Sequence, residues 1–507
     1  MESSTSASEK GPESSAESAD PSPSLPGESA EPSSITLSLV SHTNVGKTSL
    51  ARTLLRRDVG QVLDQAHVTD EAEIFELLRL ESGERLLLSD TPGFGDSAKL
   101  LKRLRRSERP VLWFLQQTWD RYTDRPFWCS QQAAMNVRRD ADVVLYLVNA
   151  TEEPDEAGYV DFELELLDWL GVPVWILLNQ TGDTSFHKEP LEPRLQRWRD
   201  HTSRFGVVGG VGALDAYNRC WVEEDKLLRE VEPLLSEDRR PLMESFREAW
   251  NQRGRDVFER CVDALAASVL RAARDREPLA SRRPSREEKE DAMEALGRRA
   301  AQAGEDLMEK LLVFHGLEGS VAAEIDRRIE AFAVHGEDLL EAERSALLGG
   351  MVSGAVGGLA ADLMAGGLTF GGGVLAGAIL GALGGAGLAK GFQLVRGDRH
   401  PSVAWSEAFL NQLLLEGMLR YLAVAHFGRG RGEFQSEASS RRWLDAAGAV
   451  HRADPVDWQA VGREGVLGQG ARVPKVLRDA VEQRLRGVLL RGYPEAQRLF
   501  AAPRSRS

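Results

Sequence analysis

Cysteine is scarce in this chain of 507 residues, and the few present follow no pairing pattern. The three residues, Cys129, Cys220 and Cys261, are odd in number, widely spaced and without a CxxC pair. That usage argues against a disulfide framework and is typical of proteins from a reducing compartment.

The chain also lacks an excess of positive charge: its 63 Lys and Arg residues are outnumbered by 78 Asp and Glu residues, which gives a formal net charge of -15. Nonspecific nucleic-acid binding requires a basic footprint, so the composition gives no direct evidence for a nucleic-acid partner. The stretch from Arg472 to Arg506 is locally rich in arginine and could still contact an acidic partner.

The first 34 residues lack aromatic side chains and any apolar run. They are rich in Ser, Glu, Pro and Ala, and such a segment cannot bury enough apolar surface to fold. We therefore expect a disordered tail over residues 1–34, which is not a signal peptide, and a first domain that starts at Ile35.

The rest of the chain divides by pattern, and its length exceeds what one hydrophobic core holds. Short apolar runs alternate with helix-like stretches up to Cys220, which predicts an α/β domain with a mostly parallel sheet. Beyond Cys220 the pattern is helical and poor in strands. The predicted units are an α/β domain, a helical region, a glycine-rich hydrophobic hairpin and a C-terminal helical region, over residues 35–220, 221–345, 346–390 and 391–507.

The stretch ITLSLVSHTNVGKTSL, residues 35–50, ends like a phosphate-binding loop between a strand and a helix. In such a P-loop, backbone N–H groups wrap the phosphates at the positive end of a helix, and the lysine reaches the β- and γ-phosphates. Ser41 stands where the pattern has its first glycine, which costs about 1–2 kcal/mol if the backbone there must be strained. Gly46, Lys47 and Thr48, which would touch the ligand, are intact.

A second motif, LLLSDTPGFGD, places an acidic residue at the end of an apolar strand, 43 residues after Lys47. Asp90 would hold the Mg²⁺ shell through water, and the hydroxyl of Thr48 would be a direct ligand. The N–H of Gly93 would bind the γ-phosphate. Between the two motifs, Thr69 is the candidate for the switch I threonine that closes over Mg²⁺, with an exposed loop threonine as the alternative.

From Ile35 to Asn218 the chain resembles the Era/TrmE-like branch of bacterial P-loop GTPases, whose pattern combines NVGKxSL with DTPG. It is most similar to a subgroup in which this domain precedes a helical, glycine-rich domain of unknown function; LDAYNRCWVEE (214–224) is similar to that subgroup's junction. The resemblance implies a P-loop GTPase domain that binds GTP or GDP with Mg²⁺ and hydrolyses GTP slowly. It also implies the residues that contact the phosphates: Asn44, Val45, Gly46, Lys47, Thr48, Ser49 and Gly93.

Two positions bear on hydrolysis. Asn44 matches the P-loop asparagine that is associated with K⁺ binding in TrmE-like members, and a turn-stabilising asparagine is the equal alternative. Phe94 stands where many GTPases place the glutamine that orients the attacking water. Relatives with a hydrophobic residue here obtain the missing group from a partner, a dimer or a monovalent cation. We therefore assign no residue of this chain as catalytic.

The base-reading motif departs from the family pattern Asn/Thr-Lys-x-Asp. In NQTGD, Asn179 fits, Gln180 replaces the lysine, and Gly182 stands where an aspartate would pair with the guanine N1 and exocyclic amine. Asp183, one residue late, could swing in after a loop adjustment; otherwise the preference for guanine is loose. Ala213, in GALD, is the candidate for the last base-contacting element.

Residues 99–139 form an insertion that begins with the basic run KLLKRLRR and continues through several aromatic side chains. Basic residues interleaved with aromatics could bind nucleic acid or lipid headgroups. A helix packed on the GTPase core with a solvated arginine face explains the same pattern, and we favour it. The aromatic residues are Trp113, Phe114, Trp119, Tyr122, Phe127 and Trp128.

Residues 346–389 contain 15 glycines and a single charge, Asp362. Glycines recur every four residues on both arms, which gives each arm a groove for close helix approach. Each arm of about 20 residues is long enough to cross a bilayer, and Arg344 and Lys390 would place both ends on one side. The weak hydrophobicity of glycine and the cost of Asp362 in hydrocarbon count against a membrane span. A tightly packed hairpin inside a soluble helical domain explains the same pattern.

Together these patterns predict a nucleotide-switched GTPase in the cytoplasm, whose switches reposition the helical domain. The hairpin would associate with a partner or with the inner face of the cytoplasmic membrane. The alternative is a membrane-associated structural or assembly protein that binds nucleotide with negligible hydrolysis. An ATP-using kinase is disfavoured, because the chain has no second phosphate-acceptor signature and DTPG is a switch motif.

Overall fold

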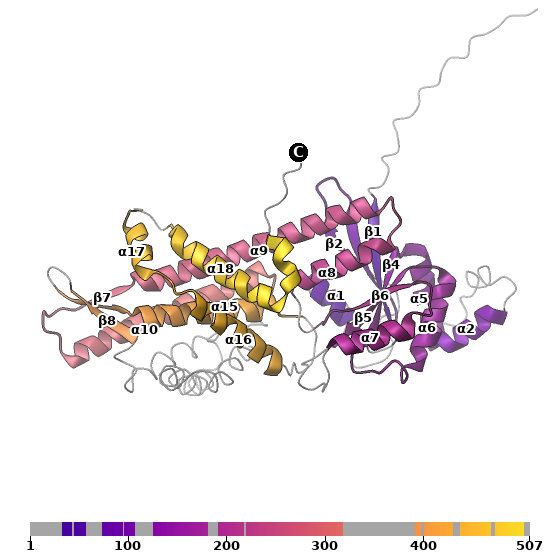
Figure 1. The fold of residues 1–507 in the computed structure, drawn as a ribbon, viewed down its shortest axis with the longest axis horizontal. Coiled ribbons are helices and arrows are strands. Elements are labelled where there is room, and N and C mark those ends of the chain that lie inside the picture. Colours follow the sequence, from indigo (N-terminus) through magenta and orange to yellow (C-terminus); the bar gives the residue numbers. More distant parts are fainter. Residues whose placement is uncertain are drawn as a thin grey trace, which may run out of the picture.

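The computed structural model shows an elongated molecule with a sheet-containing part at one end and a helical part at the other (Figure 1). The predicted glycine-rich hairpin and nearly all of the predicted tail lie outside the described residues. The structure describes residues 33–42, 45–56, 73–94, 96–106, 125–180, 191–216, 220–317, 391–396, 400–428, 437–467 and 472–500.

A six-stranded sheet forms the centre of the N-terminal part, in the order β2-β3-β1-β4-β5-β6. Every neighbouring pair is parallel except β2 and β3, which are antiparallel at one edge. The prediction of an α/β domain with a mostly parallel sheet is confirmed. The strands are β1 Ser34–Ser41, β2 Glu73–Arg79, β3 Arg85–Asp90, β4 Val143–Asn149, β5 Val174–Asn179 and β6 Val208–Ala213.

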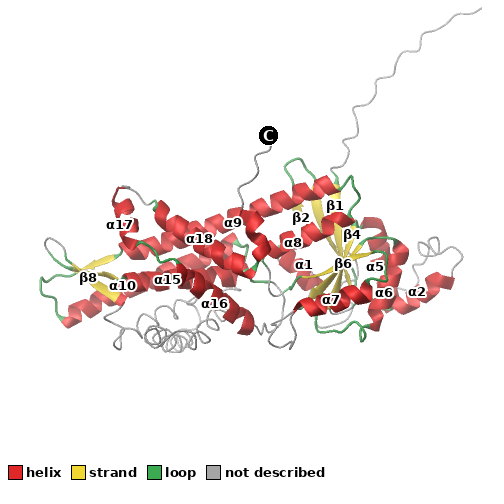
Figure 2. Ribbon diagram, in the orientation of Figure 1, coloured by secondary structure: helices red, strands yellow, loops and turns green. Residues whose placement is uncertain are grey.

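Helices cover both faces of this sheet (Figure 2). Alternate residues of β1 contribute to two separate cores, as the pleat of a strand requires: Leu37 and Leu39 to one, Val40 to the other. The first face is covered by α1 and α8 and by the start of α9, and the second by α2, α5, α6 and α7. These helices are α1 Lys47–Leu55, α2 Ser97–Arg106, α5 Arg125–Asp140, α6 Gly158–Leu170, α7 Leu191–Thr202, α8 Trp221–Val231 and α9 Arg240–Arg274.

Helix α9 joins the two parts of the molecule. It has 35 residues and is therefore about 52 Å long. Its first half packs on the sheet through Met243, Phe246 and Trp250, and its second half enters the core of the helical part through Phe258 and Leu265. One rigid element is thus shared by both cores. The other elements of the helical part are α10 Arg286–Phe314, α15 Glu407–Ala425, α16 Glu437–Ala453, α17 Trp458–Leu467, α18 Lys475–Gly492 and the short 3-10 helix η4 Pro494–Phe500.

A small antiparallel sheet lies at the end of the helical part that is far from the six-stranded sheet (Figure 1). It contains β7 (Arg276–Pro278), β9 (Ser402–Trp405) and β8 (Phe392–Val395), in that order. The sequence did not predict this sheet, since residues 391–507 were expected to form a helical region. Helix α15 begins only after β9, where the Ser406 hydroxyl accepts a hydrogen bond from the N–H of Phe409 (3.2 Å) and caps the helix.

A membrane-spanning helix is not found among the residues that the structure describes, because none of their helices is both long and apolar enough. The predicted hairpin, 346–390, lies outside the described residues.

Candidate functional site

The loop between β1 and α1 lies at the carboxyl edge of the parallel sheet, where open α/β sheets bind ligands. Gly46 precedes α1 with φ of 94°, and a Cβ there would lie 2.9 Å from Asn179 Nδ2. Both the backbone conformation and the available space therefore require glycine. Val45 and Ser49 on either side are buried, while Asn44 lies outside the described residues.

Ser41 occupies the position of the missing first glycine without backbone strain. The non-glycine residues with positive φ in the described part of the chain are Arg56 and Gln180. The Nζ of Lys47 donates a hydrogen bond of 3.3 Å to Ser41 Oγ, so the serine orients the P-loop lysine. Burial lowers the pKa of Lys47, and the nearby Asp90 carboxylate opposes that shift.

Thr48 and Asp90 meet as the sequence suggests for a Mg²⁺ site. Thr48 Oγ1 donates to Asp90 Oδ2 at 2.8 Å, from the first turn of α1 to the end of β3. Burial raises the pKa of Asp90, and Lys47 and Thr48 oppose the rise. The second oxygen, Asp90 Oδ1, is buried and has no hydrogen-bond partner among the described atoms. A free carboxylate oxygen beside a hydroxyl is a hard-oxygen donor set that fits Mg²⁺.

The described residues contain no group of three His, Cys, Asp or Glu side chains that could hold a metal by itself. A magnesium ion at Thr48 and Asp90 would therefore take its other ligands from phosphate oxygens and water, as Mg²⁺ commonly does. The predicted switch I ligand, Thr69, lies outside the described residues.

Gly93 and Phe94 follow Asp90 and lie beside the P-loop. The N–H of Phe94 donates to the Ser41 carbonyl at 3.0 Å, and His42 and Phe94 form an isolated parallel bridge. The Phe94 side chain is fully buried in the core beneath α5 and α6. It points into the protein and offers no group that could orient water.

Asn179, the last residue of β5, ties three segments of this edge together. Its Nδ2 donates to the carbonyl of Val45 in the P-loop (2.9 Å), and its Oδ1 accepts from the N–H of Ala216 (3.0 Å) after β6. Ala213 ends β6, opposite Leu178. Asn179 therefore fixes the position of the P-loop relative to the loop that follows β6.

Gln180 lies over the P-loop in the left-handed conformation, with φ of 56°. A Cβ on Gly46 would lie 3.3 Å from its Nε2, and its Oε1 accepts a hydrogen bond of 3.0 Å from Asn149 Nδ2. We did not predict a role for Asn149. An asparagine at the end of the apolar strand Val143–Asn149, in line with Asn179, was the available signal. Asp183 and Gly182 lie outside the described residues.

Sequence reasoning also missed Glu163 on α6, a fully buried carboxylate beside the P-loop. It contacts His42 Nδ1 at 2.7 Å and accepts from Tyr146 OH at 2.6 Å and Ser97 Oγ at 3.4 Å. The hydrogen bond to Glu163 raises the pKa of His42. Burial raises the pKa of Glu163 itself, and the bonds from His42 and Tyr146 oppose that rise. A glutamate inside the apolar pattern of DFELELLDWL was the signal.

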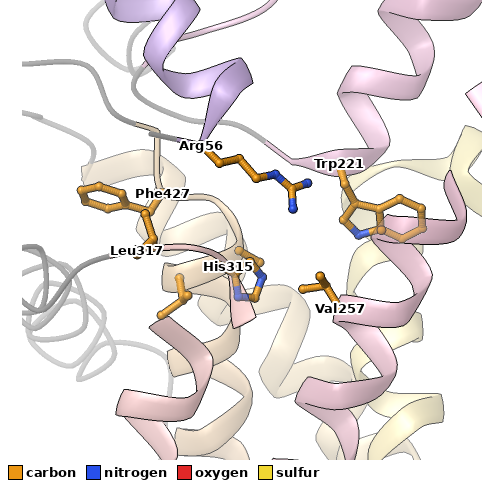
Figure 3. A pocket seen from close by; sticks show the side chains of 9 residues that line it. Arg56, Trp221, Val257, His315, Leu317 and Phe427 are labelled. Atoms are coloured by element: carbon orange, nitrogen blue, oxygen red, sulfur yellow. The ribbon is translucent and has the colours of Figure 1, made fainter. Parts of the chain in front are cut away.

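The end of α1 connects the P-loop helix to the helical part. Arg56 extends toward Trp221 across a small pocket whose other walls come from α9 and from the ends of α10 and α15 (Figure 3). Arg56 Nη2 lies 3.7 Å from Glu224 Oε2, which also accepts 2.9 Å from Trp250 Nε1. Just before it, Thr53 Oγ1 donates to the Ala216 carbonyl at 2.7 Å. The pocket residues are Arg56, Trp221, Gly254, Val257, His315, Leu317, Val424, Ala425 and Phe427.

Part of the predicted insertion packs on the GTPase core. Phe127 and Trp128 on α5 are buried, and the Lys99 ammonium lies 5.2 Å from the Phe127 ring centre. These contacts agree with the interpretation that we favoured, a helix on the core. The other four aromatic residues of the insertion, Trp113, Phe114, Trp119 and Tyr122, lie outside the described residues.

A strand, a glycine-dependent loop and a partly buried Thr–Asp pair at one sheet edge define a P-loop GTPase domain, here followed by a helical region. A family model described as a 50S ribosome-binding GTPase matches residues 36–180. A second family model, described as a domain of unknown function (DUF3482), matches residues 210–472. Because that match spans more than half of the chain, the chain belongs to the DUF3482 family.

Among solved structures, the chain is similar to an Aquifex aeolicus Era variant bound to GDP and aluminium fluoride, with 18% identity and a TM-score of 0.29. The alignment covers 40% of this chain and 58% of that one. It is also similar to Era in complex with MgGDPNP and a 16S ribosomal RNA fragment, with 17% identity and a TM-score of 0.29; this alignment covers 41% of this chain and 58% of that one. A third similar structure is a probable GTP-binding protein EngB, with 14% identity and a TM-score of 0.23; this alignment covers 36% of this chain and 88% of that one. The chain thus spans somewhat over half the length of the two Era chains. No curated protein matches it.

Proposed function

We propose that this protein is a slow GTPase switch that binds GTP or GDP with Mg²⁺ and passes its nucleotide state to the helical region. The observation that carries the proposal is the convergence of Lys47, Thr48, Asp90 and Asn179 on the loop after β1. In this proposal Asn44, Val45, Gly46, Lys47, Thr48, Ser49 and Gly93 bind the phosphates.

Each part of the chain has a separate task at this site. Lys47 supplies a positive charge to the β- and γ-phosphates, and the backbone from Val45 to Ser49 supplies N–H donors at the start of α1. Thr48, Asp90 and Thr69 would hold Mg²⁺, which neutralises charge on the transferred phosphoryl group. Asn179 holds the P-loop in place for this contact.

The base would lie against Asn179, Gln180 and Ala213, with Asp183 as the candidate carboxylate. Gln180 is neutral and is oriented by Asn149, so we propose looser selection of guanine than in GTPases with the full motif. A site that lacks a hydrogen-bonding group for the base discriminates less against analogues.

Slow turnover follows from Phe94, whose buried ring cannot orient water. A partner, a second copy of the chain or K⁺ near Asn44 would then supply the missing group. The same observation favours the second candidate function, an assembly protein that binds nucleotide with negligible hydrolysis.

The path to the helical region would run along α1. This helix begins at Lys47 in the P-loop and ends next to Arg56, which pairs with Glu224 and faces the ends of α10 and α15. Residues 346–390 would then contact a partner or the inner face of the cytoplasmic membrane.

Nucleotide turnover separates the two candidate functions. We would measure GTP hydrolysis and GTP binding on one preparation, with and without K⁺ and with and without liposomes of bacterial lipids. A slow rate that K⁺ or lipid stimulates supports the switch. Binding with no turnover in any condition supports the assembly protein, and no binding of any nucleotide contradicts both.

A further inference from the structure

A single buried side chain connects the two segments that face the γ-phosphate in the proposed GTP site. Glu163 is 0% exposed and receives hydrogen bonds from three elements of the fold. His42 belongs to the P-loop, Tyr146 to β4, and Ser97 is the first residue of α2, directly after the DTPGFGD motif.

We propose that Glu163 is a positioning residue that holds the P-loop and the start of α2 at a fixed separation, so that the site distinguishes GTP from GDP. The inference rests on the proposed function. It concerns residues that no resemblance or motif assigned, and it adds a role for α6 to the site.

The backbone already joins the two segments once, because the Phe94 N–H donates to the Ser41 carbonyl and His42 pairs with Phe94. Glu163 adds a side-chain connection from His42, next to Ser41, and from Ser97, three residues after Phe94. A displacement of Gly93 that carries Phe94 and the start of α2 away from the P-loop therefore stretches the contacts at Glu163.

Losing these contacts costs free energy. A fully buried carboxylate that loses a donor pays an unmet desolvation penalty, so it holds its partners firmly. Tyr146 remains a donor throughout, because burial and Glu163 raise its pKa well above its usual value. The Tyr146 bond fixes Glu163 to the sheet, and the sheet provides the rigid reference for both moving segments.

GDP and GTP differ in which of these two segments they contact. GDP contacts the P-loop but has no γ-phosphate for Gly93 to bind, whereas GTP needs both segments correctly placed. Loosening the α2 side should therefore weaken binding of GTP and leave binding of GDP unchanged. A purely structural role for Glu163 would weaken both nucleotides alike.

Ser97→Ala is the sharpest test, since it removes one hydroxyl and leaves the Glu163 charge in place. The ratio of the Kd for GDP to the Kd for GTPγS, measured by calorimetry with Mg²⁺, should fall about three- to tenfold, as expected for one hydrogen bond. The matched control is Ser268→Ala on α9, another buried serine whose hydroxyl donates at 3.4 Å. That change should leave the ratio as it is.

Glu163→Gln is the second variant and should lower the same ratio, provided that it folds by circular dichroism. The hydrolysis rate should also fall in Ser97→Ala while KM for GTP rises. An unchanged ratio in folded Ser97→Ala overturns the inference, as does an equal loss for both nucleotides. If the unmodified protein binds neither GDP nor GTPγS, the proposed function itself fails, which is a different result.

Discussion

Asn179 Nδ2 lies 2.9 Å from the carbonyl oxygen of Val45, so the strand edge that would read the base is hydrogen-bonded to the loop that would hold the phosphates. The same side chain accepts from Ala216 N–H through its other end. A single buried side-chain amide therefore links the P-loop, the end of β5 and the loop after β6 by hydrogen bonds. Its removal should affect stability and binding together.

Asn179→Ala should lower the free energy of unfolding by about 2–6 kcal/mol, because two buried backbone groups lose their partners at about 1–3 kcal/mol each. Urea denaturation measures this loss. Affinity for GTP should fall in the same variant. The control is Asn251→Ala on α9. Asn251 is another buried asparagine, and its side chain donates a hydrogen bond to Asp225. This change should destabilise the protein and leave GTP affinity unchanged.

The base-reading motif leads to a prediction about selectivity. Gly182→Asp should increase the preference for GTP over ATP, since a carboxylate that pairs with the base rejects analogues without the donor pair. Competition binding with both nucleotides measures the ratio. Strong discrimination in the unmodified protein that survives Asp183→Ala would show that another residue reads the base.

Arg56 and Glu224 lead to a prediction about the connection between the two parts. Arg56→Met should lower the free energy of unfolding by about 1–3 kcal/mol, because the buried Glu224 carboxylate loses a nearby cation. A double-mutant cycle with Glu224→Gln should give a coupling energy above about 0.5 kcal/mol. The control is Arg79→Met, whose exposed pair with Glu76 should change stability by less than about 0.5 kcal/mol. Additive single effects would argue against a direct connection.

The predicted hairpin is tested by lipid binding. If its arms enter a bilayer, Ile379→Arg should cost roughly 2.5–3.5 kcal/mol of insertion free energy and reduce the fraction of protein that sediments with liposomes. Both proteins are compared with and without nucleotide. Should the unmodified protein stay in the supernatant under every condition, the membrane association that we propose is wrong.

Local signals predicted the fold around the P-loop well, because short apolar runs mark β1, β3, β4 and β5, and the motif residues lie at or soon after the ends of these strands. The small sheet was missed since β7 is separated from β8 and β9 by more than a hundred residues, and strands of three or four residues carry little periodicity of their own. Pairing between such distant segments is a property of the folded chain.

The candidate site was predictable where chemistry depends on residue type and spacing, as for Thr48 and Asp90. The sequence carried a weak signal for Glu163 and for Asn149, but the roles of these residues and of Arg56 could not be derived from it, because each acts through a partner that is distant in sequence. In the sequence Glu163 is one charge among apolar residues of α6, and only the fold brings His42, Tyr146 and Ser97 to it.

The central claim is that Lys47 binds the phosphates of GTP, and calorimetry of GTP with Mg²⁺ tests it most directly. Lys47→Ala removes charge-assisted hydrogen bonds to two phosphates, so affinity should fall roughly 100-fold or more, equivalent to about 3 kcal/mol. Lys310→Ala, at an exposed position of α10, should bind GTP as the unmodified protein does. Removal of Mg²⁺ with EDTA should also weaken binding in the unmodified protein. Equal GTP affinity in Lys47→Ala and the unmodified protein would contradict the account.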